Sequence, residues 1–173
     1  MAAFTQISLG EYLQTSYRPD VEYIDGELKE KTTMGQYEHS RTQALLAAWF
    51  VRNQGLWRAV ALTEQRVQIS SQRVRIPDLI LVPVGPSPDV IVAPPLLVVE
   101  ILSSDDTYSE LQERSQDYRA MGVETIWIID PKTRTARVGT GDSWREARLL
   151  EVAGTSIYAN VDILFADLDA SRA

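Results

Sequence analysis

The chain has no cysteine and only one histidine, His39, among its 173 residues. The lack of cysteine excludes disulfides, thiolate zinc sites and cysteine nucleophiles, and a single histidine removes most zinc-enzyme templates as well. No apolar run approaches the roughly 18 residues that span a bilayer, and the N-terminus lacks a basic region followed by an apolar stretch. We therefore expect a cytoplasmic protein.

Length and composition are typical of one domain, which we expect to cover residues 1–173, since 45% apolar residues are enough for a real core. The formal net charge is −7, but residues 41–82 hold six basic and two acidic side chains, a local charge of +4. A local phosphate-facing patch is one interpretation of this stretch, and solvated strand and helix surfaces are the other. The arginines concerned are Arg52, Arg58, Arg66, Arg73 and Arg75.

The first third of the chain predicts two helices and a hairpin. Ser8 can cap a short helix that runs to Ser16. Asp25-Gly26 separates two short apolar-charged runs and favours a hairpin turn, because glycine adopts positive φ without steric cost. Over 36–52, Ala44, Leu45, Ala47, Ala48 and Val51 recur at helical spacing and predict a long helix with that apolar face.

The rest of the chain predicts strands around one further helix. Strands are expected over 58–62, 65–69, 76–82, 96–102 and 125–129, with a proline-rich loop over 84–95 and small edge strands over 135–140, 144–150 and 156–158. A helix over 108–121, capped within 103–106 and stopped by Gly122, joins two of the strands. Strand, helix and strand in this order predict a parallel crossover, and hence an α/β fold.

Asp78 and Glu100 each lie within a strongly apolar predicted strand. A buried carboxylate costs several kcal/mol unless it is paired, hydrogen-bonded or bound to metal. Two such acids from neighbouring strands would form an oxygen-rich site for a hard cation such as Mg²⁺. Alternatively, Asp78 could bond backbone amides at a strand end and Glu100 could pair with an arginine in the core.

Several motifs together resemble the Uma-type restriction endonuclease family, a bacterial branch of the PD-(D/E)xK nuclease superfamily. They are Glu22-Tyr23-Ile24-Asp25-Gly26-Glu27, His39, Pro77-Asp78, Val99-Glu100, Arg114 with Tyr118, Gly122-Val123 and Trp127-Ile128-Ile129-Asp130-Pro131. The resemblance covers roughly residues 8–168. It implies a restriction-endonuclease-like core, with a mixed central β-sheet flanked by helices and an N-terminal helix and β-hairpin.

The resemblance also implies an activity, in which Asp78 and Glu100 hold Mg²⁺ or Mn²⁺ and a metal-bound water attacks a phosphodiester of DNA. The superfamily usually adds a lysine two residues after the glutamate, where this chain has Leu102. In the Uma-type branch the lysine lies on the next helix, where this chain has Arg114. Arginine keeps the charge but does not release a proton near neutral pH. It could instead form an ordinary surface ion pair with Glu110, one turn earlier.

Glu27 and His39 are accessory candidates on the same resemblance. Glu27 could add a carboxylate, or face solvent beside Lys29 and Lys31. His39 could act as a general base or a phosphate contact, or be a partly buried, hydrogen-bonded histidine. Glu64 and Gln65 close a strand and could lie behind the site. The four tryptophans favour core and interface packing over base stacking.

Three functions are consistent with these patterns. The leading hypothesis is a Mg²⁺-dependent DNA endonuclease that acts as a homodimer, because double-strand cleavage needs two sites. The alternative is a catalytically inactive nuclease fold that serves as a nucleic-acid-binding or protein-interaction module, with Leu102 and Arg114 marking the loss of activity. A structural or regulatory acidic protein that never contacts DNA is a third possibility.

Overall fold

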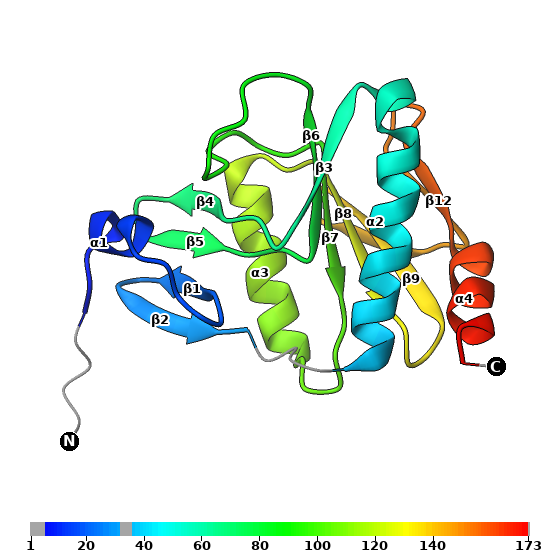
Figure 1. The fold of residues 1–173 in the computed structure, drawn as a ribbon, viewed down its shortest axis with the longest axis horizontal. Coiled ribbons are helices and arrows are strands. Elements are labelled where there is room, and N and C mark those ends of the chain that lie inside the picture. The colour runs from blue at the N-terminus through cyan, green and yellow to red at the C-terminus, as the bar shows by residue number, and fades with distance from the viewer. Residues whose placement is uncertain (1–5, 32–35, 173) are drawn as a thin grey trace.

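A six-stranded mixed sheet lies at the centre of the protein, with helices on both faces (Figure 1). The computed structural model describes residues 6–31 and 36–172. The strand order is β10-β9-β8-β7-β6-β3, and β7 and β8 run parallel while the other neighbours run antiparallel. The predicted mixed sheet and its parallel crossover are therefore confirmed. The strands are β3 (Ala59–Thr63), β6 (Leu79–Pro83), β7 (Leu97–Ile101), β8 (Thr125–Asp130), β9 (Thr135–Thr140) and β10 (Ser143–Glu146).

Two long helices cover opposite faces of this sheet, α2 (Tyr37–Trp57) and α3 (Tyr108–Met121). Successive side chains of a strand point to opposite faces. In β7, Val99 joins the core cluster that contains Phe50 of α2. Glu100 points to the other face, where Tyr118 of α3 donates a hydrogen bond to it. The acid thus lies on the α3 side of the sheet.

A second, four-stranded sheet with order β2-β1-β5-β4 carries the predicted N-terminal helix and hairpin. Ser8 caps the helix by accepting a hydrogen bond from the Glu11 N–H at 3.2 Å. Asp25 and Gly26 form the hairpin turn with φ values of 52° and 91°. Both predictions are confirmed. The elements are α1 (Leu9–Gln14), β1 (Val21–Ile24), β2 (Glu27–Glu30), β4 (Val67–Ser70) and β5 (Arg73–Arg75).

Helix α2 is longer than predicted and buries a different face. The predicted apolar face ended at Val51, but this residue is 53% exposed. The side chains that the helix buries include His39, Leu46 and Phe50. The helix continues past Gly55 because Trp57 packs edge-on against Phe50, with ring centroids 5.9 Å apart. Aromatic burial of this kind outweighs the roughly 1 kcal/mol that a helical glycine costs.

The C-terminal region ends in a helix, α4 (Val161–Ala170), where only edge strands were predicted. Asn160 caps it by accepting from the Ile163 N–H at 3.1 Å. Its buried residues Val161, Leu164, Phe165 and Leu168 follow helical spacing and join the core cluster of α2. The prediction of edge strands was also wrong for β9, which pairs on both sides with β8 and β10. Two short strands, β11 (Leu149–Glu151) and β12 (Tyr158–Asn160), precede α4.

Helix α3 has the predicted bounds, but its N-cap is Thr107, one residue after the predicted caps, and Thr107 forms a capping box with Glu110. Gly122 ends it as predicted, with φ of 104°. No helix within the described ranges is long and apolar enough to cross a membrane.

Candidate active site

Asp78 is fully buried and directly precedes β6. Its carboxylate contacts the neighbouring strand β7 and helix α2. Its Oδ2 accepts the backbone N–H of Ile101 at 2.6 Å. Its Oδ1 lies 2.6 Å from the Lys31 ammonium and 3.2 Å from His39 Nε2. These contacts hold the pKa of Asp78 far below its usual range, even though burial alone would raise it. The residue is therefore an anion inside the protein.

Glu100 is buried on β7, with 1% of its surface exposed. Oε1 accepts a hydrogen bond from the Tyr118 hydroxyl at 2.5 Å, and Oε2 accepts one from Arg114 Nη1 at 3.2 Å. Burial raises the pKa of Glu100 to about 6, and the positive charges of Arg114 and Lys31 offset part of that rise. Glu100 is thus the less strongly ionised member of the pair.

Arg114 belongs to this buried cluster and not to the exposed surface. Its guanidinium donates to Glu100 and to Asp106, and only 10% of the side chain is exposed. The alternative of a surface pair with Glu110 is not what the structure shows, since Glu110 bonds Thr107 in the capping box. The arginine that takes the place of the expected lysine therefore donates to two carboxylates at once.

Lys31 is the residue of the site that sequence reasoning missed. It follows β2, and its ammonium donates to Asp78 Oδ1 at 2.6 Å and to the Ile76 carbonyl at 2.7 Å. Glu64 Oε2 lies 3.9 Å away. The side chain is only 10% exposed. Lys31 thus brings a compact ammonium to the carboxylate that Arg114 does not reach.

Helix α2 contributes two further side chains, His39 and Gln43, which lie one turn apart and face the same way. Gln43 donates to Glu64 Oε1 at 2.7 Å and to the Asp78 carbonyl at 2.9 Å. His39 is 4% exposed and its Nε2 forms no hydrogen bond within the described part of the chain, despite its proximity to Asp78. Burial works against a charge on His39, but Asp78 outweighs it and raises the imidazole pKa.

The other candidates lie outside this cluster. Glu27 is exposed on β2, opposite Ile24. The buried carboxylate of the hairpin is Glu22, which accepts from Arg75 at 2.8 Å. Gln65 donates to the Asp89 carbonyl at 2.6 Å and does not accompany Glu64 into the site.

The phosphate-facing patch, one of the two interpretations of residues 41–82, does not fit three of its five arginines, because acidic side chains already pair with them. Arg66 pairs with Asp20, at 2.5 Å. Arg73 and Arg75 both pair with Glu113 and Asp117 of α3. Arg73 and Arg75 thus join the small sheet to α3, whereas the partner of Arg66 lies just before β1 of the small sheet itself.

The donor chemistry of the site suits one divalent cation. Two buried carboxylates from adjacent strands are ligands that Mg²⁺ and Mn²⁺ prefer. In the described residues, no group of three or more histidine, aspartate or glutamate side chains is arranged to hold a metal. His39 Nε2, however, is a buried polar atom without a hydrogen bond beside Asp78, as expected where a further group binds.

A comparison with solved structures shows which fold this chain shares. One solved structure, described as "a putative nuclease belonging to DUF820 from Anabaena variabilis", aligns over 94% of this chain and 99% of that chain. Its TM-score is 0.80 at 23% identity, which establishes the shared fold. A cryoEM structure of a DrdV–DNA complex aligns over 78% of this chain and 12% of that chain, with TM-score 0.46 and 12% identity, too low to carry an argument. No curated protein matches the sequence.

The family comparison covers most of the chain. Residues 9–160, which include every residue of the buried cluster, match the family model described as "Uma2: Putative restriction endonuclease". The chain belongs to the Uma2 family.

Proposed function

We propose that this protein is a metal-dependent endonuclease that hydrolyses phosphodiester bonds of DNA, with Asp78 and Glu100 as the ligands of Mg²⁺ or Mn²⁺. One observation carries the proposal: two almost fully buried carboxylates on neighbouring strands, at the same site as a lysine ammonium and an arginine. Burying such a cluster is costly, so a fold that keeps it must draw on it for chemistry or for specific structure.

A cation held by Asp78 and Glu100 would acidify a bound water and neutralise charge on the phosphoryl group. The other side chains of the site would have separate roles. Arg114 orients Glu100, because its guanidinium is fixed between that residue and Asp106. Gln43 fixes the Asp78 backbone. Lys31 already donates to Asp78 and to the Ile76 carbonyl, and rotation of its three donors would let it turn one toward a phosphate oxygen.

His39 and Glu27 have different places in this proposal. His39 faces Asp78 Oδ1 from α2, where it restrains that carboxylate and can exchange a proton with a nearby water. Glu27 stays an accessory candidate on the resemblance alone, and its exposed position on β2 suits a contact with DNA or a second shell of water.

The alternative function is a nuclease fold that binds nucleic acid or protein without cleaving it. A specific observation favours it: the four carboxylate oxygens of Asp78 and Glu100 already have protein partners. The cluster is electrostatically complete without metal. Under this alternative, divalent cations do not bind at Asp78.

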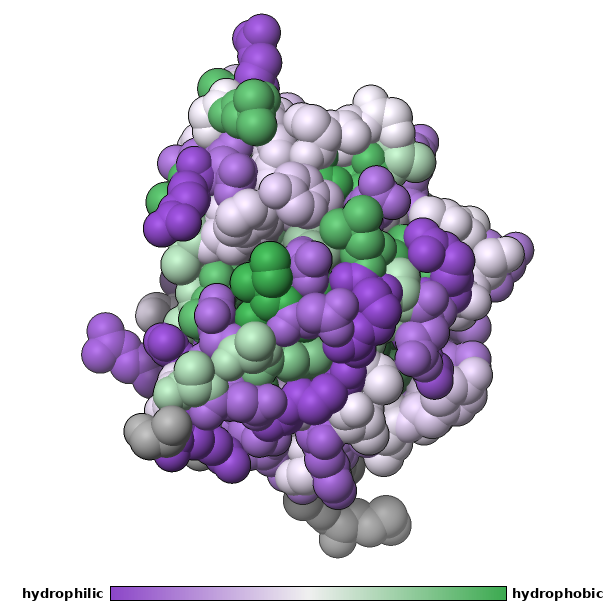
Figure 2. Space-filling view, turned by 90° about the vertical axis from the view of Figure 1, so that its right-hand side faces the viewer, coloured by the Kyte–Doolittle hydropathy of each residue, from purple (hydrophilic) through white to green (hydrophobic). Residues whose placement is uncertain are grey.

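A homodimer is part of the proposal because cleavage of both strands needs two sites. The face around α2, β12 and α4 presents apolar side chains at its centre among charged ones (Figure 2). Large apolar residues exposed on these elements are Val51 (53%), Tyr158 (39%) and Ile163 (61%). We expect light scattering to give a dimer mass that Ile163→Glu reduces to that of a monomer.

The test of the activity is a plasmid nicking assay with Mg²⁺ or Mn²⁺. Wild-type protein should convert supercoiled DNA to open-circular or linear forms, and Asp78→Asn and Glu100→Gln should not. Glu30→Gln, at an exposed position of β2, is the matched control and should cleave like wild type. Equal cleavage by all proteins, or no cleavage with any metal, contradicts the proposal.

A further inference from the structure

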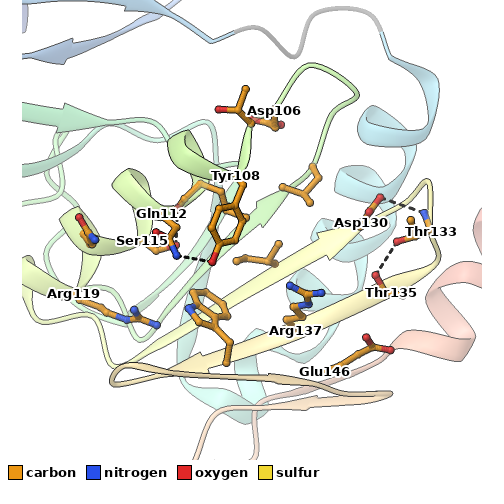
Figure 3. A pocket seen from close by; sticks show the side chains of 16 residues that line it. Asp106, Tyr108, Gln112, Ser115, Arg119, Asp130, Thr133, Thr135, Arg137 and Glu146 are labelled. Atoms are coloured by element: carbon orange, nitrogen blue, oxygen red, sulfur yellow. Dashed lines mark hydrogen bonds between the residues drawn. The ribbon is translucent and has the colours of Figure 1, made fainter.

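A cavity of about 570 Å³ lies between α3 and strands β8, β9 and β10 (Figure 3). Its volume is in the range of small-molecule and cofactor sites. Leu102, Leu111 and Ile128 supply apolar surface, and the other lining residues are mostly polar or aromatic. A cavity of this composition is suited to a ligand with one flat apolar part and several polar atoms.

The cavity adjoins the candidate active site. Asp106 lines it and also accepts a hydrogen bond from Arg114. Arg114 in turn donates to Glu100 at 3.2 Å. A ligand in the cavity therefore lies next to the group that orients a proposed metal ligand.

Two arginines of the cavity have unused hydrogen-bond donors. Arg119 comes from α3 and Arg137 from β9 (Figure 3). Neither guanidinium forms a hydrogen bond or ion pair within the described part of the chain, and Arg119 Nη2 is buried without a partner. Arg75, by contrast, bonds three carboxylates. Guanidinium groups without an acceptor favour binding of a phosphate or a carbonyl edge.

Aromatic rings complete the cavity. The Arg119 guanidinium lies 4.9 Å from the centroid of the Trp144 ring, which packs, partly buried, against the core cluster that contains Tyr118 and Ile128. Tyr108 is 72% exposed, and its hydroxyl accepts a hydrogen bond from Gln112 at 2.6 Å (Figure 3). This hydrogen bond restrains the hydroxyl end of the side chain, and the ring surface stays available for stacking.

We propose that this cavity binds one unstacked nucleotide of the substrate strand, with its base on Tyr108 and its phosphate or base edge at Arg119 and Arg137. The inference rests on the proposed function, because it takes nucleic acid as the substrate. Base stacking on aromatic side chains tolerates every base, since each has a flat face. The cavity would hold the strand beside the metal ligands without requiring a specific sequence.

Direct binding of deoxynucleoside 5′-monophosphates tests this inference without any cleavage. Isothermal titration of the full-length protein at low salt should give saturable binding of one nucleotide per chain. Titration in EDTA should give the same affinity, which separates the cavity from the proposed metal ligands. Inorganic phosphate should bind more weakly, because it lacks the base.

Matched variants locate the binding. Tyr108→Ala should weaken nucleotide binding by about tenfold through loss of stacking, whereas Tyr108→Phe keeps the ring and should bind like wild type. Arg119→Met should weaken nucleotide binding by a similar factor. Arg52→Met, at an exposed position of α2, should leave it unchanged. Circular dichroism checks that each variant folds.

The outcomes keep the two proposals apart. If wild type cleaves DNA but binds no mononucleotide, or if Tyr108→Ala and Arg119→Met bind as wild type does, the cavity inference is overturned and the endonuclease stands. If nucleotides bind as expected while no metal supports cleavage, the proposed function fails and the cavity remains a nucleotide site.

Discussion

Replacing Lys31 by methionine is expected to destabilise the metal-free protein strongly. The ammonium lies 2.6 Å from Asp78 Oδ1, and the two side chains are only 10% and 0% exposed, so solvent screens the pair little. At an effective dielectric constant of about 20, this separation corresponds to an attraction of ~6 kcal/mol. Desolvation of the lysine offsets part of it. Since removing one partner of a buried pair typically costs ~3–5 kcal/mol, we expect Lys31→Met to lower the free energy of unfolding by that amount.

Urea denaturation in EDTA measures this loss, with Lys29→Met as the matched control at an exposed position on the same strand. Lys29→Met should stay within about 0.5 kcal/mol of wild type. Adding Mg²⁺ or Mn²⁺ should stabilise Lys31→Met more than wild type, because the ion replaces the missing charge. A loss below about 1 kcal/mol for Lys31→Met would refute the argument that Lys31 compensates Asp78.

Three further changes test other parts of the structure. Because burial raises the pKa of Glu100 from 4.5 to about 6, the folded state keeps a proton that the unfolded state has lost. Stability should therefore fall by about 2 kcal/mol in all as pH rises from about 3.5 to about 7, most steeply between 4.5 and 6. Glu100→Gln should lack this decrease when both proteins are unfolded with urea in EDTA. Arg75→Met leaves buried Glu22 without its partner and should cost ~3–5 kcal/mol in the same assay, against no loss for Arg52→Met. Gly139→Ala would place a Cβ 2.6 Å from the Trp144 ring and should cost ~1–3 kcal/mol in thermal unfolding, whereas Gly55→Ala, which meets no atom within 4 Å, should stabilise helix α2.

The burial of Asp78 and Glu100 could be predicted because the apolar residues on both sides leave a strand no exposed face at these positions. The partners of the two acids could not. Lys29 and Lys31 lie two residues apart at the end of the hairpin. Nothing in the local sequence shows that Lys31 turns inward while Lys29 stays exposed. Only the packing of the hairpin against the central sheet makes that choice.

The local charge pattern also did not show which acids the arginines bind. The local charge of 41–82 suggested a basic surface, but Arg66, Arg73 and Arg75 meet acids that are distant in the sequence. Arg114 pairs with Glu100 and Asp106, although Glu110 is closer along the helix. The sequence did contain a signal here, since Thr107 and Glu110 have the spacing of a capping box, which engages the glutamate at the helix start.

The sequence also contains a pattern that predicts helix α4. Val161, Leu164, Phe165 and Leu168 recur at three- and four-residue spacing behind Asn160, a favourable cap. The short strands that precede it obscured the change of period. The helix matters for the site because it completes the core cluster that supports α2, which carries His39 and Gln43.

The central claim is that Asp78 and Glu100 hold a divalent cation, and a Mn²⁺ titration followed by electron paramagnetic resonance tests it most directly. Free Mn²⁺ gives a strong signal that binding suppresses, so bound ions can be counted without DNA or activity. We predict one bound Mn²⁺ per chain in wild type, its loss in Asp78→Asn and Glu100→Gln, and its retention in Glu30→Gln. Unchanged Mn²⁺ binding in Asp78→Asn, or none in wild type, would contradict the account.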